Sequence, residues 1–208
     1  IQGLNLTAGV SAVYLDRLGN EAQSHSQKPA AEPAVAADIA CVQFTAGSGG
    51  EAKAVLVPHA ALAARAVAAA AATGLVADDR VALTPSNASL EMILGCLSRG
   101  ATLGFAPPEA SGLLAFAEKQ KCSVLLTPAP VWQSLIGMAE GASQRFPDCI
   151  RLTAVYGERP ASSSIAACRR LSSRHARWIS SYGTAEVGAN AAGYEIRPGA
   201  DLDEPAVT

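Results

Sequence analysis

The 208-residue sequence predicts an α/β domain whose mostly parallel sheet is flanked by helices. From residue 39 onward, short apolar runs alternate with longer helical segments, which is the pattern of strand–helix–strand units. Gly74 and Gly100 follow two of the helical segments, at places where a helix commonly ends. The chain is 50% hydrophobic and only 16% charged, so both faces of such a sheet can be covered.

The first 38 residues are expected to be separate from this pattern. They contain one strand candidate, 12–15, and then a polar stretch that becomes rich in Pro and Ala around 27–33, as is typical of a linker. We therefore divide the chain into an N-terminal strand plus linker, 1–38, and an α/β domain, 39–208.

Helices are predicted where small and apolar residues recur at helical spacing. The first is an Ala-rich run that should end at Gly74, and the second should begin at Ser89 and end before Gly100. Ser111 is expected to cap the third helix. The predicted helices are 60–73, 89–99, 111–121, 131–139 and 162–172.

Strands are predicted at short runs rich in apolar and β-branched residues. In an open parallel sheet, ligands bind at the carboxyl ends of the strands. The candidate site segments are therefore those that follow three predicted strands: the glycine-rich stretch after Phe44, Ser86-Asn87, and Tyr182-Gly183. The predicted strands are 40–45, 80–84, 102–106, 123–127, 151–156, 177–181 and 192–196.

Charge and cysteine usage exclude several classes of function. A net charge of -2 argues against nucleic acid or an anionic membrane surface as a partner. The Ala-rich run is interrupted by Arg65 and is too weakly apolar to span a bilayer, and no signal peptide is recognised. The three histidines and the scattered cysteines form no ligand pattern, so we expect no metal cluster, but free thiols in a reducing cytoplasm. The cysteines are Cys41, Cys96, Cys122, Cys149 and Cys168.

The glycine-rich stretch 44–55 is the main candidate for chemistry. Gly47, Gly49 and Gly50 free the backbone to expose N–H groups, and with the ammonium of Lys53 they can form a concavity that suits phosphate. The alternative is a flexible surface loop. A Walker A loop is excluded because Lys53 is followed by Ala54.

This stretch resembles the phosphate-binding loop of adenylate-forming enzymes, in particular the adenylation domains of nonribosomal peptide synthetases. Their pattern runs Tyr-Thr-Ser-Gly-Ser-Thr-Gly-x-Pro-Lys-Gly-Val. Four positions depart from it: Ala46 stands at a hydroxyl residue, Gly49 at Thr, Ala52 at Pro and Ala54 at Gly. The matching positions are Thr45, Gly47, Ser48, Gly50, Lys53 and Val55.

Further motifs follow in the order of that family. Ser86-Asn87-Ala88-Ser89 lies where the family has Phe-Asp-x-Ser, so Asn87 replaces the aspartate that holds the ammonium group of an amino acid. Residues 152–158 resemble the strand that leads into Gly-Gly-Glu near the adenine pocket, with Tyr156 at the first Gly. The resemblance therefore assigns Gly157 and Glu158 to the nucleotide site.

The last motif, residues 181–186, resembles Asn-x-Tyr-Gly-Pro-Thr-Glu, in which the Thr contacts phosphate and the Glu ligates magnesium. Tyr182, Gly183 and Glu186 are kept here, whereas Ala185 stands at the Thr. The resemblance covers roughly 39–208 and implies a truncated part of the large N-terminal domain of this superfamily. The segment Tyr-Arg-Thr-Gly-Asp and the small C-terminal domain with its lysine are not found.

An intact member of this family activates a carboxylate with ATP and Mg²⁺. Because the departures fall on the chemical motifs, we expect a non-catalytic pseudo-adenylation domain, a structural or domain-interaction module that contacts neighbouring domains of a megasynthase. No cofactor is then expected, and ATP and Mg²⁺ only if activity remains. One alternative is part of an active amino or aryl acid adenylating domain that is completed by other segments. Another is a nucleotide-binding sensor module.

Overall fold

The computed structural model describes residues 35, 37–45, 52–84, 89–157 and 160–196. The chain divides into two units, 1–34 and 35–208. The first unit, with the predicted strand 12–15, lies outside the described residues.

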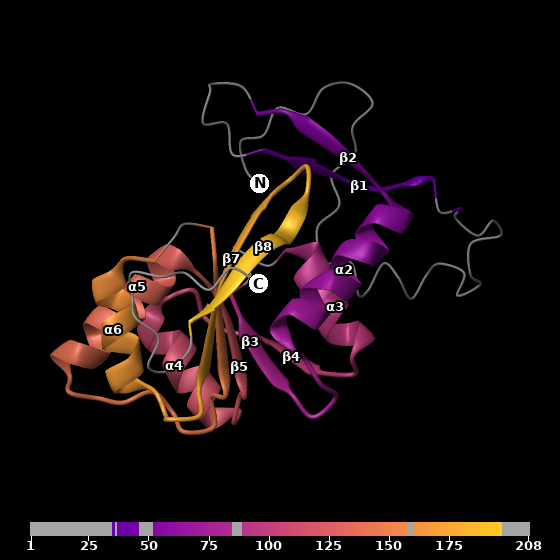
Figure 1. The fold of residues 1–208 in the computed structure, drawn as a ribbon. Coiled ribbons are helices and arrows are strands. Elements are labelled where there is room, and N and C mark those ends of the chain that lie inside the picture. Colours follow the sequence, from indigo (N-terminus) through magenta and orange to yellow (C-terminus); the bar gives the residue numbers. More distant parts are fainter. Residues whose placement is uncertain (1–34, 36, 46–51, 85–88, 158–159, 197–208) are drawn as a thin grey trace, which may run out of the picture. The chain divides into compact units, whose positions relative to one another are not determined.

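A mostly parallel sheet forms the centre of the second unit, as predicted, and it has six strands (Figure 1). Neighbouring strands are parallel throughout, except that the last strand pairs antiparallel with the one before it. In spatial order the strands are β4 (Thr102–Phe105), β3 (Arg80–Leu83), β5 (Val124–Pro128), β6 (Leu152–Tyr156), β7 (Arg177–Thr184) and β8 (Gly188–Ile196).

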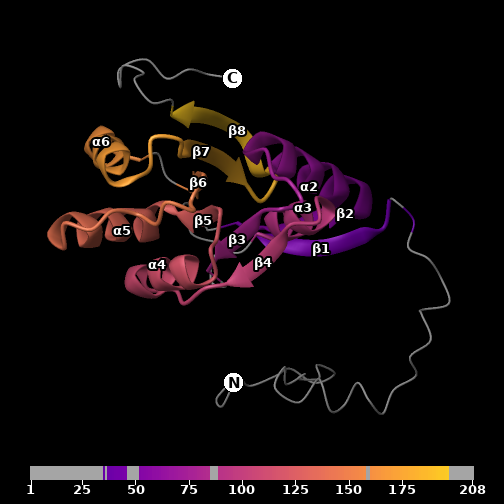
Figure 2. The same ribbon diagram turned by 90° about the horizontal axis from the view of Figure 1, so that it is seen from below.

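Helices cover both faces of this sheet (Figure 2). One face carries α2 (His59–Thr73) and α3 (Leu90–Ser98). The opposite face carries α4 (Ala110–Lys119), α5 (Ala129–Gly141) and α6 (Ser162–Leu171). This two-sided cover is the arrangement expected for parallel strands, because the helices that connect them lie on the two faces of the sheet.

Alternating side chains of the strands build two separate cores. In β5, Val124 and Leu126 pack on the side of α2 and α3, whereas Leu125 packs on the side of the other three helices. The second side also holds the rings of Trp132 and Trp178, whose centroids are 5.7 Å apart. The period of two along each strand thus accounts for apolar runs that have no polar face.

The strand order places a topological switch between β3 and β5. The chain leaves β3 towards β4 on one side and then returns to β5 on the other side, so that β3 lies between them. Ligands in doubly wound sheets bind at the carboxyl ends of the strands that flank such a switch. The segment after Thr84, which includes the predicted Ser86-Asn87, begins at this edge, but 85–88 lie outside the described residues.

The first predicted strand of the α/β domain needs correction. The predicted strand 40–45 is present as β1 (Ile39–Phe44), but it does not belong to the parallel sheet. It pairs antiparallel with β2 (Ala54–Pro58), which was not predicted, and Phe44 lies opposite Ala54. The apolar run of β2 is too short to be recognised between a glycine-rich loop and a helix, and pairing across that loop makes it a strand.

The helix boundaries follow the predictions at three positions out of four, including the end of α3 before Gly100. Gly74 ends α2 in the left-handed conformation (φ 62°), and the Ser89 hydroxyl accepts a 3.2 Å hydrogen bond from the Met92 amide. Ser111 is not the cap of α4, because the extended residue before the helix is Glu109 and Ser111 already lies in the first turn. None of the described helices is long and apolar enough to cross a membrane.

Candidate functional site

The structure describes only some of the residues that the sequence assigns to a site. Those described belong to the β1–β2 hairpin, the carboxyl end of β6 and the β7–β8 turn: Thr45, Lys53, Gly157, Tyr182, Gly183 and Glu186. The rest lie outside the described residues: Gly47, Ser48, Gly50, Asn87 and Glu158.

Thr45 and Lys53 close the mouth of the glycine-rich loop. The Thr45 amide donates to the Lys53 carbonyl at 3.0 Å, and the Lys53 amide donates to the Thr45 hydroxyl at 3.0 Å. The pairing extends the β1–β2 ladder by one step and brings the two ends of the loop together. Thr45 therefore has a structural role in the loop, and the side chain of Lys53 remains exposed at its rim.

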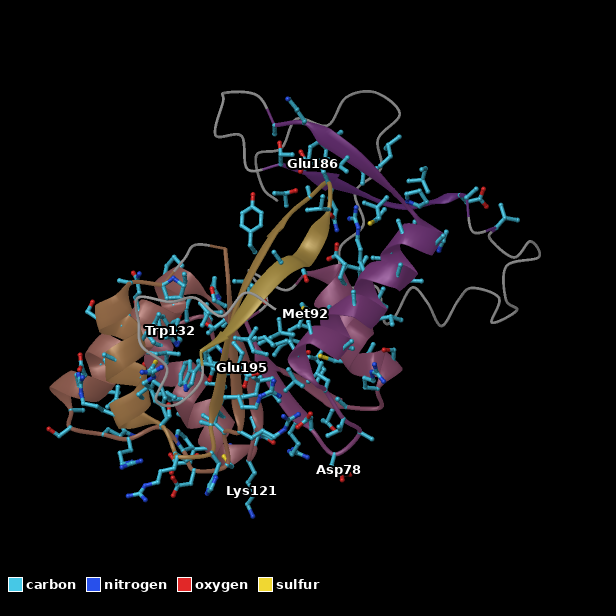
Figure 3. The ribbon with its side chains drawn as sticks, in the orientation of Figure 1. Asp78, Met92, Lys121, Trp132, Glu186 and Glu195 are labelled. Atoms are coloured by element: carbon cyan, nitrogen blue, oxygen red, sulfur yellow. The ribbon has the colours of Figure 1, made fainter. Side chains whose placement is uncertain are left out.

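The β7–β8 turn carries the second group of site residues. Tyr182 and Gly183 were expected to follow a strand, but they lie within β7, whose pairing continues to Thr184 opposite Gly188. The sequence prediction ended the strand too early because a Tyr-Gly step is typical of a turn. Tyr182 is 59% exposed, and Glu186 lies at the tip of the turn, beside the hairpin (Figure 3).

The carboxylate of Glu186 is held in its charged form. Its pKa is lowered mainly by a hydrogen bond from the Thr184 hydroxyl and then by its own backbone amide, while slight desolvation of the exposed carboxylate opposes this. The ammonium of Lys53 lowers the pKa further. The fold therefore brings Lys53 and Glu186, which are far apart in the sequence, within electrostatic reach of each other.

A single carboxylate can supply only some of the ligands of a magnesium ion. Within the described ranges, no group of three His, Cys, Asp or Glu side chains could hold a metal ion. Mg²⁺ in nucleotide sites is typically held by one or two carboxylates together with phosphate oxygens and water. Glu186 fits such a partial role and does not fit a resident metal centre.

The end of β6 is more enclosed than the turn. Tyr156 packs against the core on the side of α2 and α3, and burial raises the pKa of its hydroxyl. Gly157 follows with a φ of 98°, which residues other than glycine rarely adopt, so the chain turns sharply there. From the sequence alone, Tyr156 is recognisable only as a replacement for the first glycine of the family's Gly-Gly-Glu motif, and its burial is not.

Sequence reasoning missed a polar connection behind the turn. The guanidinium of Arg65 on α2 donates to the carbonyls of Ala185 and Glu186, and it faces the buried carboxylate of Glu91 on α3. Two signals were available in the sequence. Arg65 is the one charged residue of the Ala-rich run 60–73, and Glu91 is the one charged residue of the mostly apolar run 90–98.

Comparison with known proteins agrees with this architecture. A family profile described as AMP-binding enzyme matches residues 5–207, nearly the whole chain and further towards the N-terminus than the recognised motifs. A search of curated protein sequences found no significant match.

Several solved structures share the fold. The nonribosomal peptide synthetase FmoA3 superimposes with a TM-score of 0.73 at 19% identity over 88% of this chain. The N-terminal subdomain of Klebsiella oxytoca NpsA, in complex with 3-hydroxybenzoyl-AMSN, gives 0.70 at 21% identity over 89%. Mycobacterium smegmatis MbtA gives 0.67 at 20% over 88%. The matched region spans 20%, 48% and 33% of those chains, respectively.

Proposed function

The chain belongs to the family of AMP-binding enzymes, and we propose that it is a pseudo-adenylation domain. Such a domain is a folded module without catalytic activity, inside a nonribosomal peptide synthetase or a hybrid polyketide synthase. Residues 39–208 form its adenylation-like part and 1–38 a strand plus linker. It contacts neighbouring domains of the megasynthase, and its nucleotide site, with Gly157, Glu158, Tyr182 and Gly183, is vestigial.

The observation that carries this proposal is the chemistry of the β7–β8 turn. Ala185 stands where the family has a hydroxyl for phosphate. The neighbouring Thr184 hydroxyl lowers the pKa of the Glu186 carboxylate and so acts on that side chain. The carbonyls of Ala185 and Glu186 accept hydrogen bonds from Arg65. The two carbonyls of this turn thus already have hydrogen-bond partners within the protein.

Losses in the glycine-rich loop support the same conclusion. Ala46 and Gly49 each lack a hydroxyl that the family uses towards phosphate. A hydrogen bond to a charged group contributes about 1.5–3 kcal/mol, so two or three such losses lower transition-state stabilisation by roughly 10³-fold or more. Asn87 also lacks the negative charge that would pair with the ammonium group of an amino acid.

A second candidate function is nucleotide binding without turnover, which one observation favours. Lys53 and Glu186 are both kept, and they lie close enough to interact. Together they provide one cation for phosphate and one carboxylate for Mg²⁺, so a nucleotide sensor remains a distinct alternative. A third is an adenylating domain that is completed by other segments, acting on an amino or aryl acid with ATP and Mg²⁺.

Pyrophosphate exchange and calorimetry on the full-length protein test the proposal. The wild type is expected to show no exchange with any amino or aryl acid of a panel, and no heat of binding with ATP and Mg²⁺. The matched variant Ala46→Ser/Gly49→Thr/Ala185→Thr restores the three hydroxyls and should bind ATP more tightly than the wild type. Exchange by the wild type overturns the proposal, and binding without exchange selects the sensor.

A further inference from the structure

We propose that Arg65 and Glu91 form a positioning pair that holds the β7–β8 turn, and with it Glu186, at a fixed place beside the β1–β2 hairpin. The location of the site rests on the proposed function, but the pair acts on the protein frame and needs no bound nucleotide. The residues involved come from β1, α2, α3 and the turn, and they are brought together only by the fold.

First, the side chain of Arg65 forms two hydrogen bonds with the turn. Its NH1 donates to the Ala185 carbonyl at 3.2 Å and its NH2 donates to the Glu186 carbonyl at 2.7 Å. These two acceptors are successive carbonyls, which match the fixed fork of a guanidinium and leave little freedom for the turn. The contact joins residues 120 and 121 positions apart.

The second step is the buried charge that keeps Arg65 in place. The side chain of Glu91 is 3% exposed, and its Oε1 lies 3.6 Å from NH1 of Arg65. Burying a carboxylate is costly unless a cation or strong hydrogen bonds compensate it. The same Oε1 accepts a 3.0 Å hydrogen bond from the side-chain Nε2 of Gln43, so the pair also contacts β1.

The third step is the close passage of the turn over the stem of Arg65. Gly188 has a φ of 94°, and a Cβ placed there would lie 2.9 Å from Cδ of Arg65. Only glycine combines this backbone conformation with this approach. The close contact at Gly188 is a separate observation from the two hydrogen bonds. It also shows that the turn packs directly against the side chain of Arg65.

The consequence is a structural connection between two segments, β1 and the β7–β8 turn. Gln43 lies next to the strand end that leads into the glycine-rich loop, and Glu186 lies on the turn. Because Glu91 and Arg65 connect them, a change at β1 is transmitted to the turn and a change at the turn to β1. A plain core ion pair would stabilise the whole fold without linking these two segments in particular.

Hydrogen–deuterium exchange of the full chain without nucleotide tests this link. Arg65→Met is expected to raise the rate of amide exchange in both 41–44 and 183–188 by about tenfold, because one or two hydrogen bonds are lost. The exchange rates in 124–128 and 152–156 should stay unchanged. Arg65→Lys, whose ammonium can donate to one of the two carbonyls, should restore part of the amide protection in 183–188. The matched control is Arg99→Met, which alters an exposed arginine after α3 and should change neither segment.

The link is reciprocal, and this separates it from a structural role. Gln43→Leu should raise exchange in 183–188, and Gly188→Ala should raise exchange in 41–44. Gln43→Leu also serves if Arg65→Met does not fold. An unchanged turn in Gln43→Leu, or an equal rise in all segments of Arg65→Met, overturns the proposal. Because no nucleotide is present, these outcomes are independent of whether the domain adenylates.

Discussion

The guanidinium of Arg151 donates through Nε to one carboxylate oxygen of Asp79 at 2.8 Å and through NH2 to the other. Ser123 donates to the same carboxylate at 2.7 Å and the Val76 amide at 2.9 Å. These contacts tie the amino ends of β3, β5 and β6 together, near Asp78 at the edge opposite Glu186 (Figure 3). The amino ends of these three strands, which lie away from the candidate site, are therefore held together by side-chain hydrogen bonds.

This contact predicts a pH-dependent stability. Burial favours the protonated form of Asp79, but hydrogen bonds from Arg151, Val76 and Ser123 outweigh it and lower its pKa below 3.8. A lowered folded pKa stabilises the protein above the unfolded value, and this stabilisation is lost as the pH falls through the folded pKa. In urea unfolding at neutral pH, Asp79→Asn should cost about 2–4 kcal/mol, a difference that narrows below pH about 4.

The neighbouring exposed residue provides the control. Asp78→Asn should change the free energy of unfolding by less than about 0.5 kcal/mol at every pH. If the free energies of unfolding of wild type and Asp79→Asn differed by the same amount down to low pH, the charged form of Asp79 would not be the cause of the stabilisation.

Two helical glycines should respond in opposite directions to the same substitution. A Cβ at Gly95 in α3 would lie 2.8 Å from the Ala66 carbonyl of α2, so Gly95→Ala forces these helices apart and should cost about 1–3 kcal/mol. Gly137 in α5 has nothing within 4 Å of that position, and Gly137→Ala should stabilise by about 0.5–1 kcal/mol. Thermal melts of both variants check this, and equal effects would contradict the close packing of α2 and α3.

Carboxyl NMR titration of Glu186 tests the approach of the loop to the turn. Its pKa lies below 4.5, first because of the Thr184 hydroxyl and also because of Lys53. Thr184→Ala should therefore raise the pKa of Glu186 most, and Lys53→Met should raise it less. Lys119→Met, on the exposed side of α4, should leave it unchanged. An unaltered titration in Lys53→Met would mean that the two charges are not neighbours in solution.

The tryptophan cluster should dominate the stability of the α4–α6 side. Trp132 is fully buried and packs against Trp178, so Trp132→Ala should cost about 3–5 kcal/mol in urea unfolding. Phe44 is 68% exposed, and Phe44→Ala should cost less than about 0.5 kcal/mol. The remaining fluorescence of Trp178 monitors the transition in the first variant. A small loss for Trp132→Ala would contradict a tightly packed core there.

Most of the architecture follows from local sequence. Apolar runs such as 124–128 and 152–156 predict buried parallel strands, and Gly74 and Ser89 predict helix boundaries, because periodicity and capping act over a few residues. The family was recognisable for the same reason, since the glycine-rich stretch and the segment 181–186 are contiguous motifs. The strand β2 was missed because it depends on pairing across the glycine-rich loop. The start of α4 was placed two residues too late, at Ser111 instead of Glu109.

The sequence by itself determined the alternation of strands and helices, the family and the positions at which hydroxyls are missing. Only the tertiary structure decided that β1 leaves the parallel sheet, that Lys53 approaches Glu186 and that Arg65 holds the turn. The pairs Gln43–Glu91 and Arg65–Ala185 are separated by 48 and 120 residues. Contacts at such separations arise from the packing of whole elements, and neither propensity nor periodicity encodes which polar groups that packing will bring together.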